Sequence, residues 1–535
     1  MRNATAILSM LHEGPERNSA TRLFRGEPVL RWTLRRLARA KLVPAVAVLC
    51  WEDQLDQVGA ETGRAYVLAK GPRVALREVD AISAARRWSD GWRGGLLSTC
   101  DFDLGFYGPW FAEVAKKIDS DAVLLVDPSA ALVDPAVLDG LVAHAEANPN
   151  TEMCFVPAAP GLGGALLRGA LLDRLALAKA HGGRLLHYLP DQTSREPLAG
   201  EMCAPVATSV ARTTHRFKLD SDRQIARMSA AMVSLNGHLI SSSAEELVHR
   251  AAAWQTVDPL PREVVLELNT DRATRPIWWA GAYQTVSRPP MSLNIARQLI
   301  SELSALDDTR LTIAGVGDPL LYDGLFDVID CARNAGLLSI HVESDFLGAT
   351  PEAIVRLAAA PVDVVSVHVP AMSQRTYEQV MGIDGYVRVV ETIREFVSAR
   401  KGRNVPILVP TFMKCRQNMA EMEAWYDQWL RAVGCAVVRG PSDCGGQIPD
   451  VSVADMTPPK RKPCTRLASR LTILSDGRIV SCEEDVLGRQ VLGQVGRDSL
   501  QEVWSKAFGT LRADHRELKL DARPLCGNCK EWHRP

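Results

Sequence analysis

Between residues 1 and 230, short apolar runs alternate with helical patterns. ATAILSML (Ala4–Leu11) and VPAVAVLC (Val43–Cys50) predict buried strands, and GEPVLRWTLRRLARAKL between them has the period of about 3.6 residues that indicates a helix. A further apolar run ends at Asp127 and leads into a helical pattern that starts near Asp134. This alternation predicts a Rossmann-like α/β domain.

The same alternation returns between residues 263 and 441, with runs that are rich in β-branched residues. Helical patterns such as MSLNIARQLISELSAL separate these runs. The repeats predict a parallel sheet with helices outside, a partial (β/α)6 barrel whose chemistry would lie at the C-terminal ends of the strands. The predicted strands are Val264–Leu268, Leu311–Ala314, Leu338–Glu343, Val362–Val369, Val405–Pro410 and Cys435–Arg439.

The chain ends in CGNCKEWHRP, in which Cys526 and Cys529 have the spacing of half a metal site. A haem attachment site would have His directly after the second cysteine, where this chain has Lys530. A thioredoxin-type redox pair is also disfavoured, because no strand–helix pattern follows the two cysteines. Two further ligands are therefore expected from elsewhere in the chain.

A predicted hairpin upstream supplies those two ligands. Residues 472–481 form two runs of β-formers split by Asp476-Gly477, a pair that favours a tight turn because such a turn needs positive φ at both centres. The hairpin places Cys482 at the end of its second strand and brings Cys464 toward the same end. A helical pattern then returns the chain to the closing pair, so four thiolates can converge.

The spacing of these cysteines bears on the metal that they would bind. A zinc ribbon usually carries two short knuckles of two cysteines each, whereas Cys464 and Cys482 are spread across a hairpin. Iron–sulfur clusters accept ligands from scattered loops, because a cluster is larger than a single ion. We therefore expect one 4Fe–4S cluster, with a zinc ion or no metal as the alternatives.

The order C…ILSDGRIVSC…LGQV…SLQEVW…LR…CGNC resembles the SPASM domain, a cysteine-rich C-terminal module of many radical S-adenosylmethionine (SAM) enzymes. In that family the hairpin, the cysteine after it, the helix and the closing cysteines form an auxiliary cluster site. Family members often hold two auxiliary clusters, and the four cysteines here imply a single one. The resemblance thus implies that Cys464, Cys482, Cys526 and Cys529 hold a 4Fe–4S cluster.

The segment IAGVGDPLLYDGLFDVIDCARNAG resembles the strand end of the radical SAM core that holds the amino group of SAM. The resemblance implies contacts to SAM or another ligand from Gly317, Asp318 and Pro319, and from Glu343 in the later segment VESD. After its first strand, however, the family places three cysteines as CxxxCxxC, and this chain has LELNTDRATRPIWWAGAY there. The resemblance is therefore to a degenerate core, for which we do not expect reductive SAM cleavage, and it leaves open whether SAM binds.

The segment DRATRPIWW occupies the place of the missing cysteines. We interpret Trp278 and Trp279 as packing residues that fill the space a cluster would take. The alternative is that Asp271, Arg272 and Arg275 bind a small anionic ligand or a peptide at this strand end.

Three segments of the N-terminal third, FRGEPVLRWTLRRLARAK, VLLVDPSAALVDP and HRFKLDSDRQIARM, resemble the cytidylyltransferases that activate acidic sugars and glycosyltransferase-A (GT-A)-like nucleotidyltransferase folds in general. The resemblance implies Mg²⁺ bound by Asp127 and Asp220, since Mg²⁺ prefers oxygen ligands. The family's first loop is rich in Gly and basic residues, whereas this chain offers Gly14 with Arg17 and Arg22 as the phosphate partners.

These resemblances divide the chain into expected domains and linkers. We expect a nucleotidyltransferase-like domain at 1–230, a linker at 231–262 and a radical-SAM-like barrel at 263–441. A second linker at 442–463, rich in Gly, Pro and Lys, precedes the SPASM domain at 464–535.

Composition and charge limit which classes of partner and which cellular compartment we expect. The formal net charge of −1 gives no reason to expect nucleic acid or an anionic membrane as a partner. No apolar run approaches the length of a membrane span, and ATAILSML is followed by HEGPER and not by a signal-peptide cleavage site. We expect a cytoplasmic protein with reduced thiols. Single cysteines such as Cys415, Cys435 and Cys444 are interpreted as core residues, with a second metal site as the alternative for these three.

The three-part order resembles the spiro-SPASM proteins, which pair a nucleotidyltransferase-like head with a barrel that lacks the usual cysteines. We expect an iron–sulfur protein that transfers electrons or binds a substrate in a modification pathway, with a peptide, a protein or a redox partner. One alternative is a sugar-nucleotide transferase of the cytidylyl type that uses the N-terminal domain. An atypical but working radical SAM enzyme is the third hypothesis.

Overall fold

The computed structural model describes residues 3–63, 65–89, 96–191, 198, 200–235, 237–254 and 258–534. The chain forms two compact units, Met1–Thr256 and Val257–Pro535. Both combine α-helices with mainly parallel β-sheets, as the alternating sequence pattern predicts. Among the helices of the described residues, none has both the length and the apolarity that crossing a membrane requires.

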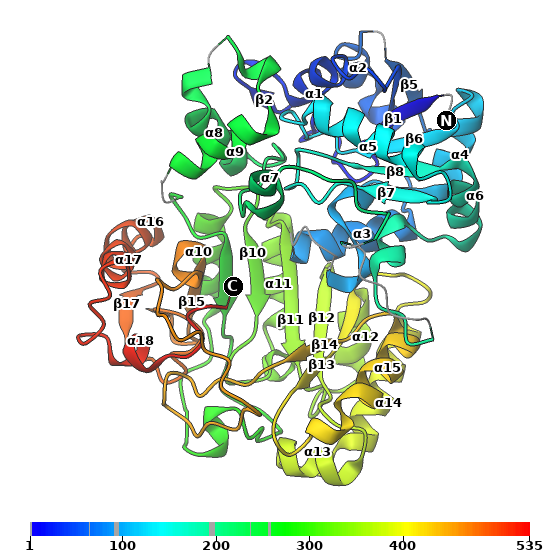
Figure 1. Ribbon diagram of the computed structural model, residues 1–535. Coiled ribbons are helices and arrows are strands. Elements are labelled where there is room, and N and C mark those ends of the chain that lie inside the picture. The colour runs from blue at the N-terminus through cyan, green and yellow to red at the C-terminus, as the bar shows by residue number, and fades with distance from the viewer. Residues whose placement is uncertain are drawn as a thin grey trace. The chain divides into compact units, whose positions relative to one another are not determined.

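The N-terminal unit is organised around a six-stranded sheet with the order β5-β4-β1-β6-β8-β7 (Figure 1). Strands β5, β4, β1 and β6 are parallel, and β8 runs antiparallel to both of its neighbours. Along β1, Ala6 and Leu8 belong to one apolar cluster and Ile7 to another, so both faces of the sheet are covered, which explains the continuous apolar runs. The strands are β1 Ala4–Ser9, β4 Ala45–Cys50, β5 Tyr66–Ala69, β6 Ala122–Val126, β7 Met153–Phe155 and β8 Ala165–Arg168, and a separate pair joins β2 Leu23–Phe24 to β3 Glu27–Pro28.

The helices of this unit include the two that the sequence predicts. α5 starts at Pro135, and the carboxylate of Asp134 caps it by accepting a hydrogen bond from the amide of Ala136. α9 lies in the predicted linker 231–262, of which residues 236 and 255–257 are outside the described part, and it buries Leu247 in the apolar core of the unit. The helices are α1 Val29–Leu37, α2 Leu55–Gly59, α3 Arg77–Trp88, α4 Gly108–Lys117, α5 Pro135–Ala147, α6 Gly169–Ala178, α7 Thr208–Arg212, α8 Asp222–Ala231 and α9 Ala244–Ala253.

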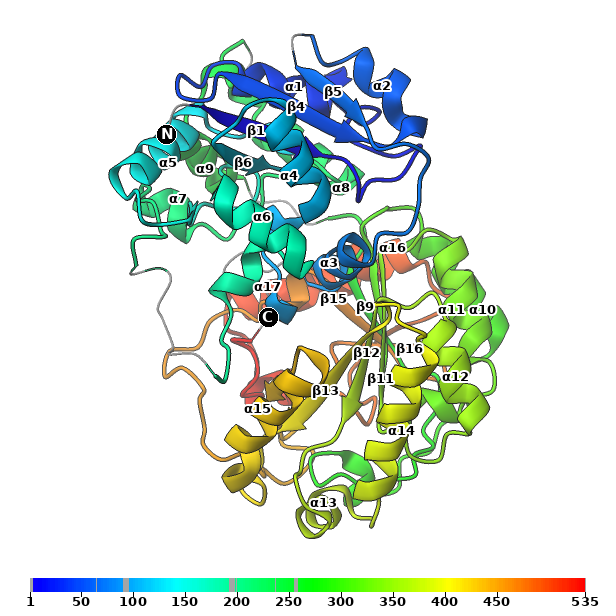
Figure 2. The ribbon, with the colours of Figure 1, turned by 90° about the vertical axis from the view of Figure 1, so that its right-hand side faces the viewer.

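A nine-stranded sheet forms the centre of the C-terminal unit, in the order β14-β13-β12-β11-β10-β9-β15-β16-β17 (Figure 2). Neighbouring strands from β14 to β15 are parallel, and β16 is antiparallel to both of its neighbours, β15 and β17. All the strands predicted between residues 263 and 441 are present, with ends shifted by a few residues. The strands are β9 Glu263–Leu266, β10 Arg310–Ile313, β11 Ser339–Ser344, β12 Val364–His368, β13 Ile407–Met413, β14 Val437–Arg439, β15 Arg470–Ile473, β16 Arg478–Val480 and β17 Val491–Gln494.

The predicted hairpin of β15 and β16 continues this parallel sheet. β15 pairs with β9 in parallel, with Arg470 opposite Glu263. The turn lies at Asp476-Gly477 as predicted, but only Gly477 has positive φ, 83°, so the expectation of positive φ at both centres is wrong. The cysteine-rich end of the chain is therefore anchored to the first strand of the parallel series.

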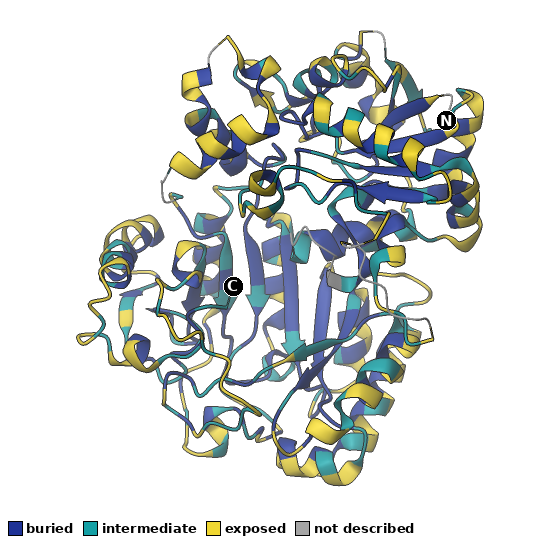
Figure 3. Ribbon diagram, viewed as in Figure 1, coloured by how far each residue is buried: buried dark blue, intermediate teal, exposed yellow. Residues whose placement is uncertain are grey.

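Helices α10, α11, α12 and α14 lie along one side of the parallel strands, with buried inner faces and exposed outer faces (Figures 2 and 3). The helix predicted after the hairpin is α16 and α17 joined by a π-helical turn, and its apolar face buries Leu500, Trp504 and Phe508. The helices are α10 Leu293–Leu303, α11 Leu325–Asn334, α12 Pro351–Ala359, α13 Gln374–Met381, α14 Tyr386–Ala399, α15 Met422–Val433, α16 Leu500–Glu502, α17 Phe508–Arg516 and α18 Pro524–Asn528.

Candidate metal centre

The four C-terminal cysteines lie on different elements. Cys464 precedes the turn that leads into β15, Cys482 follows β16, Cys526 lies in α18 and Cys529 ends that helix. Cys464 interacts electrostatically with both Cys526 and Cys529, and Cys529 interacts with Cys482. The hairpin and the end of the chain therefore meet in space and bring the four thiols into one neighbourhood.

The spacing of these side chains limits what they could hold. In the described part of the chain, no three His, Cys, Asp or Glu side chains come close enough together to hold a single metal ion. A tetrahedral zinc site needs four ligand atoms about 2.0–2.3 Å from the ion. An iron–sulfur cluster is larger than a single ion and takes thiolates that are further apart.

Burial controls the protonation of the thiols. It raises the pKa of Cys526 to about 11 and the pKa of Cys529 to about 12, and it raises the pKa of Cys482 well above its usual range. The carboxylate of Glu484 raises the pKa of Cys482 and of Cys529 further. Only thiolates bind iron or zinc, so binding to these side chains releases protons.

Arg461 holds the loop that carries the closing cysteines. Its guanidinium donates hydrogen bonds to the carbonyl oxygens of Cys526 and Cys529, each at 2.8 Å, and lies 5.2 Å from the ring centroid of Trp532. The amide of Glu531 donates to the sulfur of Cys529 at 3.2 Å. The loop is thus fixed by its backbone, and its sulfurs remain available as ligands.

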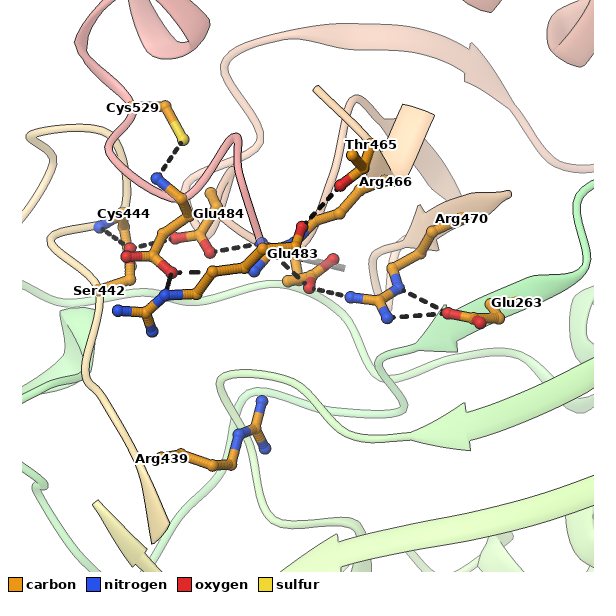
Figure 4. Close-up of polar contacts among 12 residues, drawn as sticks. Glu263, Arg439, Ser442, Cys444, Thr465, Arg466, Arg470, Glu483, Glu484 and Cys529 are labelled. Atoms are coloured by element: carbon orange, nitrogen blue, oxygen red, sulfur yellow. Dashed lines mark hydrogen bonds and ion pairs between the residues drawn. The ribbon is translucent and has the colours of Figure 1, made fainter. Parts of the chain in front are cut away.

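Arg466 lies at the centre of a group of carboxylates beside the cysteines (Figure 4). Its guanidinium is 2.8 Å from the carboxylate of Glu484, 3.2 Å from that of Glu483 and 3.9 Å from that of Glu531. Glu483 and Glu484 directly follow Cys482, and Glu531 lies in the closing segment. One buried cation therefore joins the end of the hairpin to the end of the chain.

Arg470 continues this ionic contact to the parallel sheet. Its guanidinium is 2.6 Å from Glu483 and 2.8 Å from Glu263, the first residue of β9 (Figure 4). No local signal in the sequence indicates that the carboxylate of Glu483, next to Cys482, would pair with both Arg466 and Arg470.

A second buried ion pair, Glu267 and Arg288, contacts the hairpin segment at its turn and after Cys482. Two nitrogens of Arg288 donate to the two carboxylate oxygens of Glu267, each at 2.8 Å, and a third donates to the carbonyl of Val486 at 3.0 Å. Glu267 also accepts from the amides of Ser475 at 3.1 Å and Val316 at 3.0 Å. The pair therefore holds the segment that contains Cys482 at points before and after it.

Cys444 is a fifth cysteine at this centre, which the sequence analysis did not place here. It interacts electrostatically with Cys529, and its amide donates to the hydroxyl of Ser442 at 3.0 Å (Figure 4). Its position in a predicted linker gave no signal of this proximity. Cys415 and Cys435 are buried, Cys415 within the main apolar cluster, as the core interpretation predicts.

The C-terminal ends of the parallel strands carry the residues implied by the radical SAM resemblance. Arg272, after β9, donates hydrogen bonds to the carbonyls of Gly315 at 3.3 Å, Val316 at 2.8 Å and Gly317 at 3.0 Å. Its guanidinium also lies 2.5 Å from the carboxylate of Asp345. The backbone acceptors at the end of β10 are thus occupied by a side chain of the protein.

Asp318 is buried at the same strand ends. Its carboxylate accepts hydrogen bonds from the hydroxyl of Ser344 at 2.9 Å and from the amides of Asp345 at 2.8 Å and Leu320 at 3.0 Å. Burial and the neighbouring carboxylate of Asp345 raise the pKa of Asp318. The structure thus groups Asp318 with Asp345, which follows β11 and which the sequence analysis did not single out.

Glu343 has a different partner. Its carboxylate lies 3.0 Å from the guanidinium of Arg439 on β14. Burial alone would raise the pKa of Glu343, but Arg439 and His341 outweigh it and lower this pKa to about 2. Glu343 is therefore an ionised partner of Arg439.

The two tryptophans after β9 pack around these strand ends. Trp278 is buried, and the Trp279 ring lies 3.6 Å from the guanidinium carbon of Arg272. His368 lies 6.5 Å and 5.8 Å from the two ring centroids. Trp278 is thus a core residue, Trp279 is half-buried against Arg272, and Arg275 is exposed.

In the N-terminal unit, the residues implied by the cytidylyltransferase resemblance are engaged by other side chains. Asp127 contacts the ammonium of Lys218, and Asp220 contacts the guanidinium of Arg216. Burial alone would lower the pKa of Lys218, but nearby carboxylates including Asp127 and Asp220 raise it. Arg17 and Arg22 form ion pairs with Asp222, each at 2.9 Å.

Three proteins illustrate what the chain is similar to. An uncharacterized protein of Treponema pallidum is 28% identical over 303 residues, which cover 53% of this chain and 81% of that protein. SuiB of Streptococcus suis is 12% identical with a TM-score of 0.42, covering 53% of this chain and 78% of SuiB. A cytidylyltransferase of Leptospira borgpetersenii is 14% identical with a TM-score of 0.34, covering 48% of this chain and 99% of the other. Neither structural likeness is close enough to assign a fold or an activity.

The cysteine-rich end of the chain gives a more specific result. Residues 464–530, which contain Cys464, Cys482, Cys526 and Cys529, match the model of SPASM, an iron-sulfur cluster-binding domain. This match confirms the resemblance on which the cluster prediction depends, and the C-terminal part of the chain is similar to an iron–sulfur cluster-binding domain.

Proposed function

We propose that the protein binds one 4Fe–4S cluster through Cys464, Cys482, Cys526 and Cys529, and that it transfers electrons or binds a substrate in a modification pathway without cleaving SAM. The observation that carries the proposal is the meeting of four thiols from the hairpin and the closing segment within residues 464–530. The match of this segment to an iron-sulfur cluster-binding domain favours a cluster over a single zinc ion.

The surrounding residues suit a cluster with a net negative charge. A 4Fe–4S cluster supplies one-electron chemistry, and its potential depends on nearby charge, hydrogen bonds to sulfur and exposure. Arg466 offsets the carboxylates beside Cys482, and the amide of Glu531 donates to the sulfur of Cys529. These contacts stabilise thiolate charge and orient the ligands.

Electron transfer is the role that the exposure of the ligands favours. Cys464, Cys482 and Cys529 are only partly buried, whereas Cys526 is buried. Partial exposure of these three residues supports a site that a redox partner can approach from the surface of the unit. A peptide or protein substrate is the other partner class that the proposal allows.

SAM does not fit the strand ends of this chain. The segment after β9 has no cysteine that could seat a SAM-cleaving cluster. Arg272 donates to the carbonyls of residues 315–317, and Asp318 accepts from Ser344 and Asp345. The groups that the resemblance assigns to the amino group of SAM therefore already have partners, and we derive no step through SAM.

Anaerobic reconstitution of the full chain with iron and sulfide tests the cluster. The expected product contains about four irons and about four sulfides per chain. Cys529→Ala should lose most of the bound iron, while Cys331→Ala, a matched thiol on α11 away from the proposed ligands, should retain it. Zinc without sulfide, or full iron in a variant that lacks both Cys526 and Cys529, would overturn the assignment.

Two further measurements address the role. Isothermal titration with SAM should give no heat, and incubation with SAM and a strong reductant should give no 5′-deoxyadenosine. Anaerobic titration of the reconstituted protein with the reductant should bleach the visible absorption reversibly. A cluster that cannot be reduced and reoxidised would leave substrate binding as the role, and SAM cleavage would refute the proposal.

A further inference from the structure

The N-terminal unit contains a buried group of charges that the iron–sulfur proposal does not use. The side chain of Lys218 is 1% exposed, its ammonium contacts the carboxylate of Asp127, and it lies 3.3 Å from the carboxylate of Asp101. Burying an ammonium costs free energy unless the charge is paired, so these two carboxylates stabilise Lys218 in its buried position. The side chain of Asp127 is itself buried.

Asp127 and Asp220 are the carboxylates to which the cytidylyltransferase resemblance assigns Mg²⁺. One oxygen of Asp127 accepts hydrogen bonds from the amide of Ser129 at 2.9 Å and from its hydroxyl, and the other contacts Lys218. Both oxygens of Asp220 accept from the guanidinium of Arg216. Mg²⁺ demands near-octahedral oxygen coordination at about 2.0–2.1 Å, which these engaged carboxylates do not offer.

We propose that Lys218 is the resident cation of this group of carboxylates, so that the N-terminal unit binds no divalent cation between Asp127 and Asp220. The inference concerns the N-terminal unit alone and does not depend on the iron–sulfur proposal. It also excludes the metal-dependent nucleotidyl transfer that the resemblance implies, because such transfer needs Mg²⁺ at these two carboxylates.

The charge of Lys218 acts in two ways on an incoming cation. It neutralises the carboxylates that would attract the ion, and it repels the ion directly at contact distance. At an effective dielectric constant of about 20, one unit charge about 4 Å away changes the affinity for a monovalent ion by roughly a thousandfold, and the affinity for a divalent ion by more. Removing the ammonium should therefore expose a carboxylate site that a divalent cation can use.

Titration of the full chain with Mn²⁺, followed by the electron paramagnetic resonance signal of the free ion, tests this inference. Wild type and Asp127→Asn should bind Mn²⁺ equally weakly. Lys218→Ala should bind one Mn²⁺ per chain at least about a hundredfold more tightly than wild type. Lys218→Ala combined with Asp127→Asn should lose this gain.

Lys116→Ala is the matched control, because Lys116 forms an exposed ion pair with Asp173 in the same unit. This variant should bind Mn²⁺ as wild type does. Wild-type binding that Asp127→Asn abolishes would overturn the proposal, as would a folded Lys218→Ala variant without any gain. If Lys218→Ala does not fold, the comparison of wild type with Asp127→Asn still decides whether a cation binds at Asp127.

Discussion

Replacing Arg288 with Met leaves the carboxylate of Glu267 buried without its cation. Both side chains are almost completely buried, at 5% and 4% exposure, and they share two hydrogen bonds of 2.8 Å. The carboxylate would keep the amides of Ser475 and Val316 as donors, but it would lose the ion pair with Arg288. The change therefore breaks a buried ion pair without altering the apolar core.

The size of the effect follows from this geometry. Charge centres about 4 Å apart interact by about 4 kcal/mol at an effective dielectric constant of about 20. This agrees with the roughly 3–5 kcal/mol that breaking a buried pair on one side usually costs. For a unit of this size each kcal/mol lowers Tm by about 2–4 °C, so Arg288→Met should lower the Tm of the C-terminal unit by on the order of 10 °C.

Differential scanning calorimetry of the full chain measures the shift. The double variant Glu267→Gln with Arg288→Met should recover part of the loss, because it buries no uncompensated charge. Lys506→Met, which breaks an exposed ion pair with Glu502, should change stability by less than about 1 kcal/mol. The reasoning is refuted if Arg288→Met behaves like Lys506→Met, or if the double variant is less stable than both single variants.

Three further changes test other parts of the C-terminal unit. Burial lowers the pKa of His341 to about 4 from 6.5. The contribution of His341 to stability is therefore complete above pH 6.5 and is lost as the pH falls through 4. His341→Gln should remove up to about 3 kcal/mol of this acid sensitivity, measured by calorimetry at pH 4 and pH 7. Arg461→Met should make a chelator remove iron several-fold faster, because it frees the carbonyls of Cys526 and Cys529, and an unchanged rate contradicts that role. Gly477→Ala should lower the free energy of unfolding by about 1–2 kcal/mol, because φ is 83° and the new Cβ would lie 2.7 Å from a side-chain nitrogen of the neighbouring strand. An unchanged Tm would argue against strain at the turn.

Local signals were sufficient to predict most strands of the C-terminal unit, and in the N-terminal unit they predicted β1, β4 and β6. A buried strand needs a continuous apolar run, and the Asp476-Gly477 pair marks a turn wherever it occurs. The pairing of β15 with β9 could not be predicted in this way, because an apolar strand pattern does not specify its neighbour. That pairing joins Arg470 to Glu263, residues 207 positions apart.

The residues of the candidate site also fall into two groups, those that local sequence signals predict and those that depend on the folded backbone. Cysteine spacing and the hairpin between Cys464 and Cys482 gave the proposed ligands from sequence alone. The hydrogen-bond partners of Arg272 could not be predicted from sequence, because they depend on the close approach of the segment after β9 to the segment after β10. At that approach a Cβ on Gly317 would lie 1.9 Å from the side-chain oxygen of Asn269. A long cationic side chain can reach many acceptors, and only the folded backbone selects among them.

Both units place a cation of their own where the corresponding resemblance expects an external group. Arg272 donates to the carbonyl of Gly317, one of the residues that the resemblance assigns to SAM, and Lys218 contacts a carboxylate that the other resemblance assigns to Mg²⁺. In each unit a side chain of the protein is therefore paired with a carboxylate at this position. The closing cysteines differ, because burial raises the pKa of Cys526 and of Cys529, and the nearby guanidiniums of Arg461 and Arg466 do not reverse this shift. We therefore expect the cluster site to be where this chain still depends on a bound group, and iron loading to stabilise the C-terminal unit while Mn²⁺ leaves the N-terminal unit unchanged.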